Sequence, residues 1–119
     1  MRSATKNKVG KDPAKIAWLH QQTCAITGEK RNITVHHVRR YGSLRDDARA
    51  IPLVDRLHML ASLHPRKRGE PCVEQGKTVF QNYWKVDLEE LVERYQRMWE
   101  THCLDEMERE KGIAARTVV

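Results

Sequence analysis

Four of the six histidines in this 119-residue chain lie within residues 36–64: His36, His37, His58 and His64. Neutral imidazole is a common ligand for first-row transition metals, and the usual histidine pKa is the side-chain pKa nearest neutrality. One cluster can therefore supply both the ligands for a cation and the base for a hydrolysis. A lone histidine would more simply be a surface or core residue, whereas four histidines around one small unit predict a metal site.

The spacing of the histidines determines how they can converge. His36 and His37 lie in a β-branched segment, and adjacent residues of a strand face opposite sides. One of the pair can thus point to a metal while the other reaches a substrate from the flank. His58 and His64 would lie about 240° apart on a continuous helix, unlike the i, i+4 pair of a zinc-binding helix. Pro65 disfavours helical geometry at His64, so we expect His64 to leave the helix and turn back towards the site.

Two groups of basic residues flank the histidines: Arg39, Arg40 and Arg45 on one side, and Arg66, Lys67 and Arg68 on the other. Their cationic groups can contact phosphate oxygens on either side of a scissile bond. General solubility is the simpler explanation for such a surface. Nothing in the chain resembles a base-reading recognition helix, so we expect little sequence specificity.

The charge of the chain is unevenly distributed. Residues 1–86 carry 17 Lys and Arg against 7 acidic residues, whereas residues 87–111 carry 4 against 9. A basic body attracts polyanions because neutralised phosphates release counterions, which makes DNA a candidate partner. Residues 1–11 are basic and lack periodicity. They are either a flexible arm along a nucleic-acid backbone or a tail without a role.

The pattern of apolar residues predicts the elements that must hold the histidines. Asp12 and Pro13 are typical of a helix start, and this short helix should end near Thr23. Two short strands follow, at residues 33–38 and 51–53. The histidine pair thus falls at the end of the first strand.

Three further helices are expected. Asp55 can cap one that ends by His64 and carries Leu57, His58, Leu60 and Ala61. A second spans residues 77–84, with four residues facing inward: Val79, Phe80, Tyr83 and Trp84. The last is capped by Asp87 and carries apolar residues at three- and four-residue steps: Leu88, Leu91, Val92, Tyr95, Met98, Trp99, Cys103 and Met107. That stripe packs either against the body or against a second copy, so we expect a monomer or a homodimer through this helix.

The length and composition predict a single soluble domain over residues 12–119, preceded by the arm. The expected mixture of strands and helices gives this domain the α+β class. The chain is 39% hydrophobic, and no apolar run approaches the roughly 20 residues of a membrane-spanning helix. No secretory signal is recognisable, so a cytoplasmic location is expected. The three cysteines, Cys24, Cys72 and Cys103, are scattered and odd in number, which argues against a disulfide framework.

The order of these motifs resembles the HNH family of endonucleases. The motifs that carry the resemblance are Val-His-His-Val at residues 35–38, Ile-Pro-Leu at residues 51–53, and Leu-His at residues 57–58 and again at 63–64. The similarity is greatest to a short branch of phage and prophage nucleases that includes RecA-dependent enzymes, and it extends over residues 24–96. It implies a ββα-metal core at about residues 24–65, with a short helix before it and two helices after it in the part 77–111.

By this resemblance, His36, His58 and His64 are metal ligands and His37 is the general base. The base removes a proton from water, which attacks phosphorus in line, and one divalent cation stabilises the phosphate and the leaving 3′ oxygen. Imidazole ligands favour Mn²⁺, Ni²⁺, Co²⁺ or Zn²⁺, whereas Mg²⁺ would bind mainly through substrate oxygens. The expected function is metal-dependent hydrolysis of DNA, connected with phage or prophage recombination. A recombinase filament is a further candidate partner.

The chain departs from the family in two places. Many relatives hold a structural zinc with two CxxC pairs, of which this chain keeps only Cys24. Arg49 stands where the family has its central Asn and cannot accept a hydrogen bond, a role that would pass to Asp46 or Asp47. These changes leave an alternative open: a DNA-binding recombination-accessory protein whose HNH core has lost activity.

Overall fold

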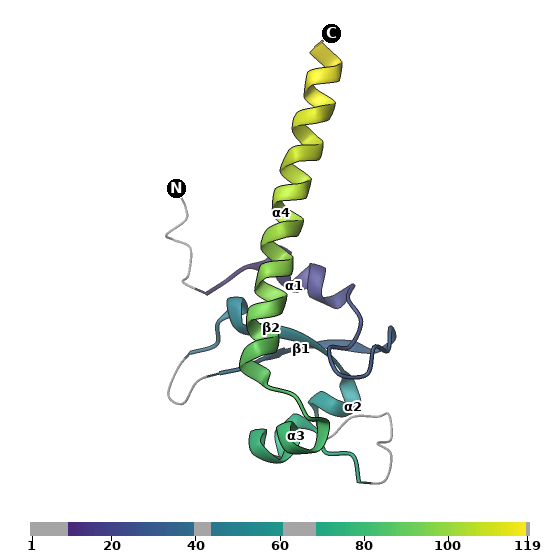
Figure 1. The fold of residues 1–119 in the computed structure, drawn as a ribbon, viewed down its shortest axis with the longest axis vertical. Coiled ribbons are helices and arrows are strands. Elements are labelled where there is room, and N and C mark those ends of the chain that lie inside the picture. Colours follow the sequence, from purple (N-terminus) through teal and green to yellow (C-terminus); the bar gives the residue numbers. More distant parts are fainter. Residues whose placement is uncertain (1–9, 40–43, 61–68, 119) are drawn as a thin grey trace.

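A computed structural model of the chain describes residues 10–39, 44–60 and 69–118, the side chains of residues 113–118 excepted. The elements follow in the order α1 (Pro13–His20), β1 (Ile33–His37), η1 (Asp47–Arg49), β2 (Ala50–Val54), α2 (Asp55–His58), η2 (Val73–Gln75), α3 (Lys77–Trp84) and α4 (Leu88–Val118), where η1 and η2 are short 3₁₀ helices (Figure 1). Helices around a two-stranded sheet confirm the predicted α+β class.

The two strands pair antiparallel, with His36 opposite Ile51 and His37 opposite Ala50. Every residue of β2 is buried, whereas the residues of β1 are all partly exposed. β2 therefore forms part of the core, and β1 is the outer strand that carries the histidine pair. The predicted limits of both strands are correct to within one residue at each end.

Three helix caps were predicted, at Asp12, Asp55 and Asp87, and Asp87 accepts from the amide of Glu89 at 2.9 Å at the start of α4. The other two have different outcomes. Asp12 caps α1, because its carboxylate accepts a hydrogen bond from the amide of Lys15 at 3.2 Å. This helix ends at His20, three residues earlier than expected. Asp55 is not a cap: it is the first residue of α2, which begins without a side-chain capping hydrogen bond.

Lys15 of α1 is fully buried, which its charge did not suggest. Its ammonium group donates to the carbonyl of Ala48 at 3.1 Å and to Oε1 of Gln96 at 2.6 Å. Burial lowers the pKa of Lys15, although nearby carboxylates such as that of Asp12 partly oppose the shift. The side chain links α1, η1 and α4 around one cation.

α2 is a single turn that ends at His58, so the predicted continuation of this helix through Leu60 is wrong. Met59 has an extended backbone, and the amide of Leu60 donates to Oε1 of Glu74 at 2.6 Å. The chain thus leaves the helix at Met59 and contacts η2. The rest of the predicted helix, residues 61–64, lies outside the described residues.

α3 has the predicted limits, but only half of its predicted inward face is covered. Phe80 is fully buried, and Trp84 packs against the core and donates to the carbonyl of Pro71 at 3.3 Å. Val79 and Tyr83 are 55% and 48% exposed. The helix therefore contacts the body along one edge, and the prediction for Val79 and Tyr83 is wrong.

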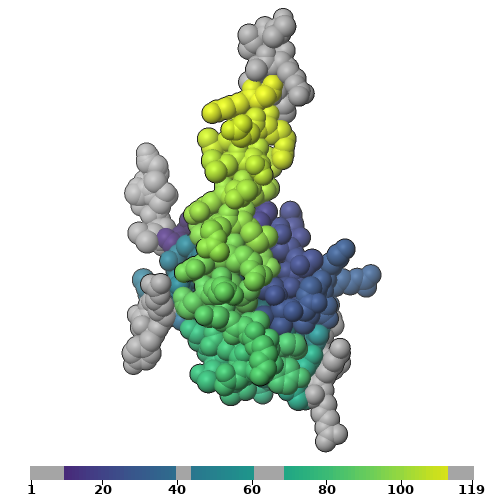
Figure 2. All heavy atoms as spheres, viewed as in Figure 1, coloured from purple at the N-terminus to yellow at the C-terminus, as the bar shows by residue number. Residues whose placement is uncertain are grey.

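α4 has a packed first part and a projecting second part (Figures 1 and 2). Its first two turns place buried residues on the body: Leu88, Leu91, Val92 and Tyr95. Farther along, Met98, Leu104 and Met107 are 40%, 61% and 53% exposed. The helix also continues to Val118, beyond the expected end at residue 111.

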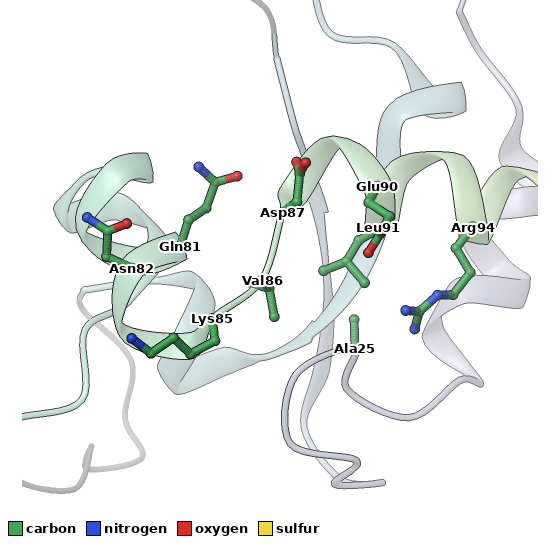
Figure 3. A pocket seen from close by; sticks show the side chains of 9 residues that line it. All are labelled: Ala25, Gln81, Asn82, Lys85, Val86, Asp87, Glu90, Leu91 and Arg94. Atoms are coloured by element: carbon green, nitrogen blue, oxygen red, sulfur yellow. The ribbon is translucent and has the colours of Figure 1, made fainter.

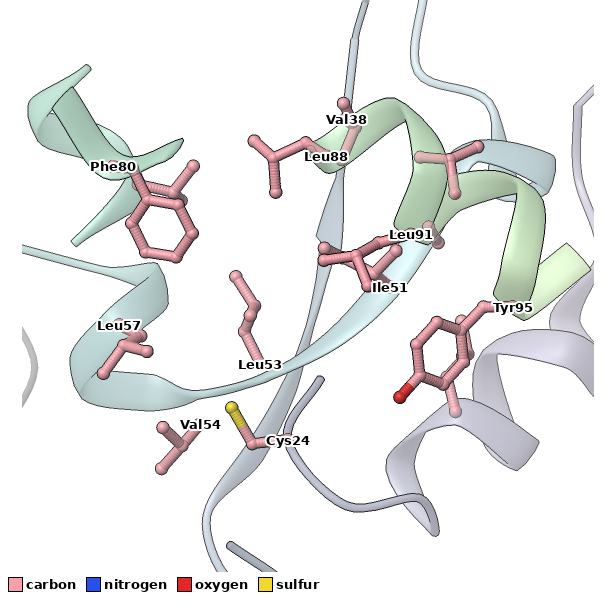
Figure 4. Packing of buried hydrophobic residues seen from close by; sticks show 14 residues of the cluster. Cys24, Val38, Ile51, Leu53, Val54, Leu57, Phe80, Leu88, Leu91 and Tyr95 are labelled. Carbon is pink, nitrogen blue, oxygen red and sulfur yellow. The ribbon is translucent and has the colours of Figure 1, made fainter. Parts of the chain in front are cut away.

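The hydrophobic core lies where α3 and α4 meet the sheet and α2 (Figure 4). Phe80 and Leu88 face the side chains of Leu53 and Leu57, and Tyr95 closes the other end of the cluster. Burying a side chain of this size stabilises the fold by roughly 1.5–3 kcal/mol. The core fixes β2 and α2, and through them the position of His58.

The three cysteines are free thiols, as predicted. Cys24 and Cys72 are buried, and Cys103 on α4 is partly exposed. Within the described parts of the chain, no helix combines the length and the apolar character that crossing a membrane requires.

Candidate metal-binding site

One cavity of about 360 Å³ brings three of the four predicted histidines together. It lies at the end of β1 and is bounded by α2 and η2, with these lining residues: Val35, His36, His37, Arg39, Arg45, His58, Val73 and Glu74. The fourth predicted histidine, His64, lies outside the described residues. Segments that are distant in the sequence thus converge on a single cavity.

The rings of His36 and His58 lie next to each other in this cavity. Their ring centroids are 5.1 Å apart, and the rings meet edge to face at 62°. Burial, together with the nearby rings of His58 and His37, lowers the pKa of His36 to about 4. Burial also lowers the pKa of His58, against the opposing effect of Glu74. Both imidazoles are therefore neutral at physiological pH and keep the lone pairs that a cation needs.

Thr34 determines which nitrogen of His58 carries the proton. Its hydroxyl lies 2.7 Å from the carbonyl of Leu53 and 2.8 Å from Nδ1 of His58. The carbonyl can only accept, so the hydroxyl donates its single hydrogen there and accepts from Nδ1–H of His58. The proton of neutral His58 is consequently on Nδ1, and Nε2 keeps its lone pair.

His37 has a different partner. Its Nε2 lies 2.7 Å from Oδ1 of Asp47, a residue that is only 6% exposed. Burial alone would raise the pKa of Asp47, but hydrogen bonds from the amide of Asp12 and the ring of His37 hold it below its usual value. The neighbouring rings therefore diverge, one towards His58 and one towards Asp47, while both line the same cavity.

Two of the six predicted phosphate contacts, Arg39 and Arg45, lie on the wall of this cavity. Both are exposed, so their guanidinium groups can reach a ligand that enters from solvent. The other four candidates, Arg40, Arg66, Lys67 and Arg68, lie outside the described residues, as do residues 1–9 of the predicted basic arm.

Arg49 has a structural role next to the site. Its Nε donates to the carbonyl of Val38 at 2.8 Å, and its guanidinium pairs with Glu89 at the start of α4. Of the two acids expected to serve the loop, Asp46 accepts from the amide of Ala48 at 3.0 Å. Asp47 instead directs its carboxylate to His37.

Sequence reasoning missed three contributors to the cavity and its surroundings. Thr34 precedes His36 by two residues on the same strand, so alternation alone could have placed both on one face. Asp47 was considered only as an acceptor for the loop, and no local pattern connects it with His37. Glu74 comes from η2, and nothing in its neighbourhood indicates that it would border the histidines.

A second hollow of about 800 Å³ lies between the end of α3 and the start of α4 (Figure 3). Its charged lining residues are Lys85, Asp87, Glu90 and Arg94, and its remaining lining residues include no histidine or cysteine. It is larger than the histidine cavity but lacks the donors that a transition metal prefers.

Comparisons with protein-family models, with curated proteins and with solved structures gave no match. Within residues 10–39, 44–60 and 69–118, no three His, Cys, Asp or Glu side chains are grouped so as to hold a metal ion. The described cavity thus presents two neutral imidazoles from the predicted ligand set, with a third histidine beside them.

Proposed function

We propose that this chain is a metal-dependent DNA endonuclease of the HNH type. The observation that carries the proposal is the convergence of His36, His37 and His58 on one cavity whose wall includes two arginines. Two rings are arranged as neutral donors and the third is held by a carboxylate, which is the division between ligands and base that a hydrolase needs.

The order of the elements supports the same function. β1, a loop, β2 and α2 follow one another along the chain, so the histidine pair ends a strand and His58 ends the adjoining helix. This is the order expected of a ββα-metal core. His36 and His58 fit a first-row cation because their imidazoles are neutral and their rings are close, and His64 would complete the set.

The residues of the chain have separate roles in this hydrolysis. His37 accepts a proton from a water molecule while the oxygen of that water bonds to phosphorus. The bond from phosphorus to the 3′ oxygen breaks, and the leaving oxygen takes a proton from solvent. Arg39 and Arg45 contact the phosphate oxygens. A cation held by the other histidines, when bound, would stabilise negative charge on the phosphate.

The first test is incubation of supercoiled and of single-stranded circular DNA with the protein across Mg²⁺, Mn²⁺, Co²⁺, Ni²⁺ and Zn²⁺. We expect metal-dependent nicking that falls about 10²- to 10⁴-fold in His37→Ala, since that is the usual contribution of a positioned base. His37→Ala should keep its affinity for DNA and metal. The matched control is His20→Ala at the end of α1, an exposed position outside the cavity, which should cut at the wild-type rate. Wild-type cleavage by His37→Ala would refute the assignment of the base.

A second candidate function is DNA binding without cleavage, as in a recombination-accessory protein. Arg49 favours this function, because it occupies the position of the central Asn and is committed to Val38 and Glu89. Binding that weakens with salt, together with no cleavage under any of the five cations, would support this function over the nuclease.

A further inference from the structure

We propose that Asp47 is the positioning residue of the site: it holds Nε2–H of His37, so that Nδ1 is the nitrogen that removes the proton from water. This inference rests on the proposed nuclease function and specifies which atom of His37 reacts. It also assigns a role to a buried carboxylate that is ten residues from its histidine in the sequence.

The first step of the argument concerns hydrogen-bond capacity. Asp47 Oδ1 lies 2.7 Å from Nε2 of His37, and Oδ2 accepts from the amide of Asp12 at 2.7 Å. An ionised carboxylate has no proton to give, so Nε2 of His37 must be the donor. In the neutral ring the second nitrogen, Nδ1, then carries the lone pair.

The second step concerns how firmly Asp47 is held. Its amide donates to the carbonyl of Gly10 at 2.7 Å, so the segment at residues 10–12 contacts it through both backbone and side chain. Asp12 is itself fixed, because its Oδ2 accepts from the indole Nε1 of Trp99 on α4 at 3.1 Å. The orientation of His37 therefore depends on the attachment of the N-terminal segment and of α4.

Gly10 shows how closely the N-terminal segment packs against the residues around Asp47. Its φ of +85° favours glycine, and a Cβ at this position would lie 3.3 Å from Cα of Asp46. Any side chain here would strain the backbone and displace the residues next to it, including Asp47. Gly10→Ala is thus a way to disturb the position of the carboxylate without changing its chemistry.

The third step concerns the reaction. When His37 takes the proton from water it becomes an imidazolium, and the Asp47 carboxylate stabilises this charge through the bond that it already makes. An Asn at position 47 would offer one acceptor oxygen to two donors, His37 Nε2–H and the amide of Asp12. The ring would lose its fixed orientation or the N-terminal segment would lose its contact.

The kinetic test compares Asp47→Asn with Asp46→Asn. Asp46 is the adjacent carboxylate and accepts from the loop amide of Ala48, so its variant controls for charge and loop position. We expect kcat for DNA cleavage to fall about 10- to 100-fold in Asp47→Asn with little change in KM, the range usual for loss of a group that orients an imidazole. Gly10→Ala should show a smaller fall in kcat. Asp47→Asn that cuts at the wild-type rate would overturn the proposal.

The spectroscopic test does not require activity. In metal-free protein with ¹⁵N-labelled histidine at about pH 8, above the usual histidine pKa, the His37 signals are assigned by their loss in His37→Gln. We expect the proton on Nε2 in the wild type and a mixture of the two tautomers in Asp47→Ala. The assignment needs only that His37→Gln folds, and a wild-type proton on Nδ1 would overturn the proposal even if Asp47→Ala does not fold. If the wild type shows the Nε2–H form but does not cut DNA, the nuclease function fails while the role of Asp47 in orienting His37 stands.

Discussion

The histidine cavity and the hollow between α3 and α4 differ in what their walls can do. The hollow between α3 and α4 is the larger, at about 800 Å³ against about 360 Å³, and its charged lining mixes both signs. The histidine cavity contains neutral nitrogen donors and a ring paired with a buried carboxylate. Size alone does not indicate function; convergent donors with a defined protonation state do.

Of the substitutions that distinguish the two hollows, His58→Ala should have the largest effect, a loss of metal affinity. Loss of one imidazole from a small set of ligands should weaken binding of Zn²⁺ or Ni²⁺ by at least about 100-fold, the upper end of the range for losing only a group that orients a ligand. Isothermal titration calorimetry measures this directly. Gln81→Ala, in the larger hollow, is the control and should leave metal affinity unchanged. An equal loss of metal affinity in both variants would show that the two hollows do not differ in metal binding.

The pH dependence of folding stability should also differ between substitutions in the two hollows. The folded-state pKa of Asp47 lies below its usual value of 3.8, so its stabilising contribution is complete above that value and is lost as the pH falls through the folded-state pKa. Asp47→Asn should therefore lower the free energy of unfolding by about 1.5–3 kcal/mol at neutral pH, the usual worth of hydrogen bonds to a charged group.

The difference between Asp47→Asn and the wild type should shrink below about pH 4. Urea unfolding at a series of pH values provides the measurement. Asp87→Asn in the larger hollow is the matched control, because an Asn at the start of α4 can still accept from the amide of Glu89. If Asp47→Asn lowers the free energy of unfolding equally at every pH, the charge of the carboxylate is not involved.

Thr34→Val tests whether the tautomer of His58 matters. Valine has nearly the shape of threonine but no hydroxyl, so Nδ1 of His58 loses its acceptor and the lone pair is no longer confined to Nε2. We expect metal affinity to fall about tenfold. Thr78→Val, at an exposed position on α3, is the control for the same substitution. An unchanged affinity in Thr34→Val would mean that the cavity tolerates either tautomer.

The smallest effect is expected from Arg45→Gln. Removing one phosphate contact should weaken DNA binding slightly and reduce the slope of log affinity against log salt by about 1. Arg94→Gln removes the same charge from the wall of the larger hollow and should leave the slope as it is. Fluorescence anisotropy with a labelled duplex across a salt series measures both. If Arg94→Gln has the greater effect, DNA lies against the other hollow.

Local signals in the sequence were sufficient to predict much of the fold. The cap at Asp12, the β-branched segment that forms β1 and the limits of α3 depend on residues within a few positions of each other. The early end of α2 was not predicted in this way, and the contact that follows it joins the amide of Leu60 to Glu74, 14 residues farther along the chain. The burial of Lys15 likewise depends on Gln96, 81 residues away.

The candidate site shows the same difference between what local sequence predicts and what depends on tertiary contacts. Adjacent strand residues were expected to diverge, and the rings of His36 and His37 do so. What the sequence could not supply is the set of partners that fix each ring: Thr34 for His58 and Asp47 for His37. Residue type identifies a possible ligand or base, but its tautomer depends on tertiary contacts.

α4 carries a cysteine that can be labelled selectively. Cys24 and Cys72 are 2% and 0% exposed, whereas Cys103 is partly open to solvent. A thiol-reactive dye or surface linker should therefore attach at one place on the unmodified chain. Burial and nearby carboxylates, those of Asp12 and Glu100 among them, raise the pKa of Cys103, so mildly alkaline buffer favours the coupling. Single molecules could then be tethered to a surface through Cys103 on α4.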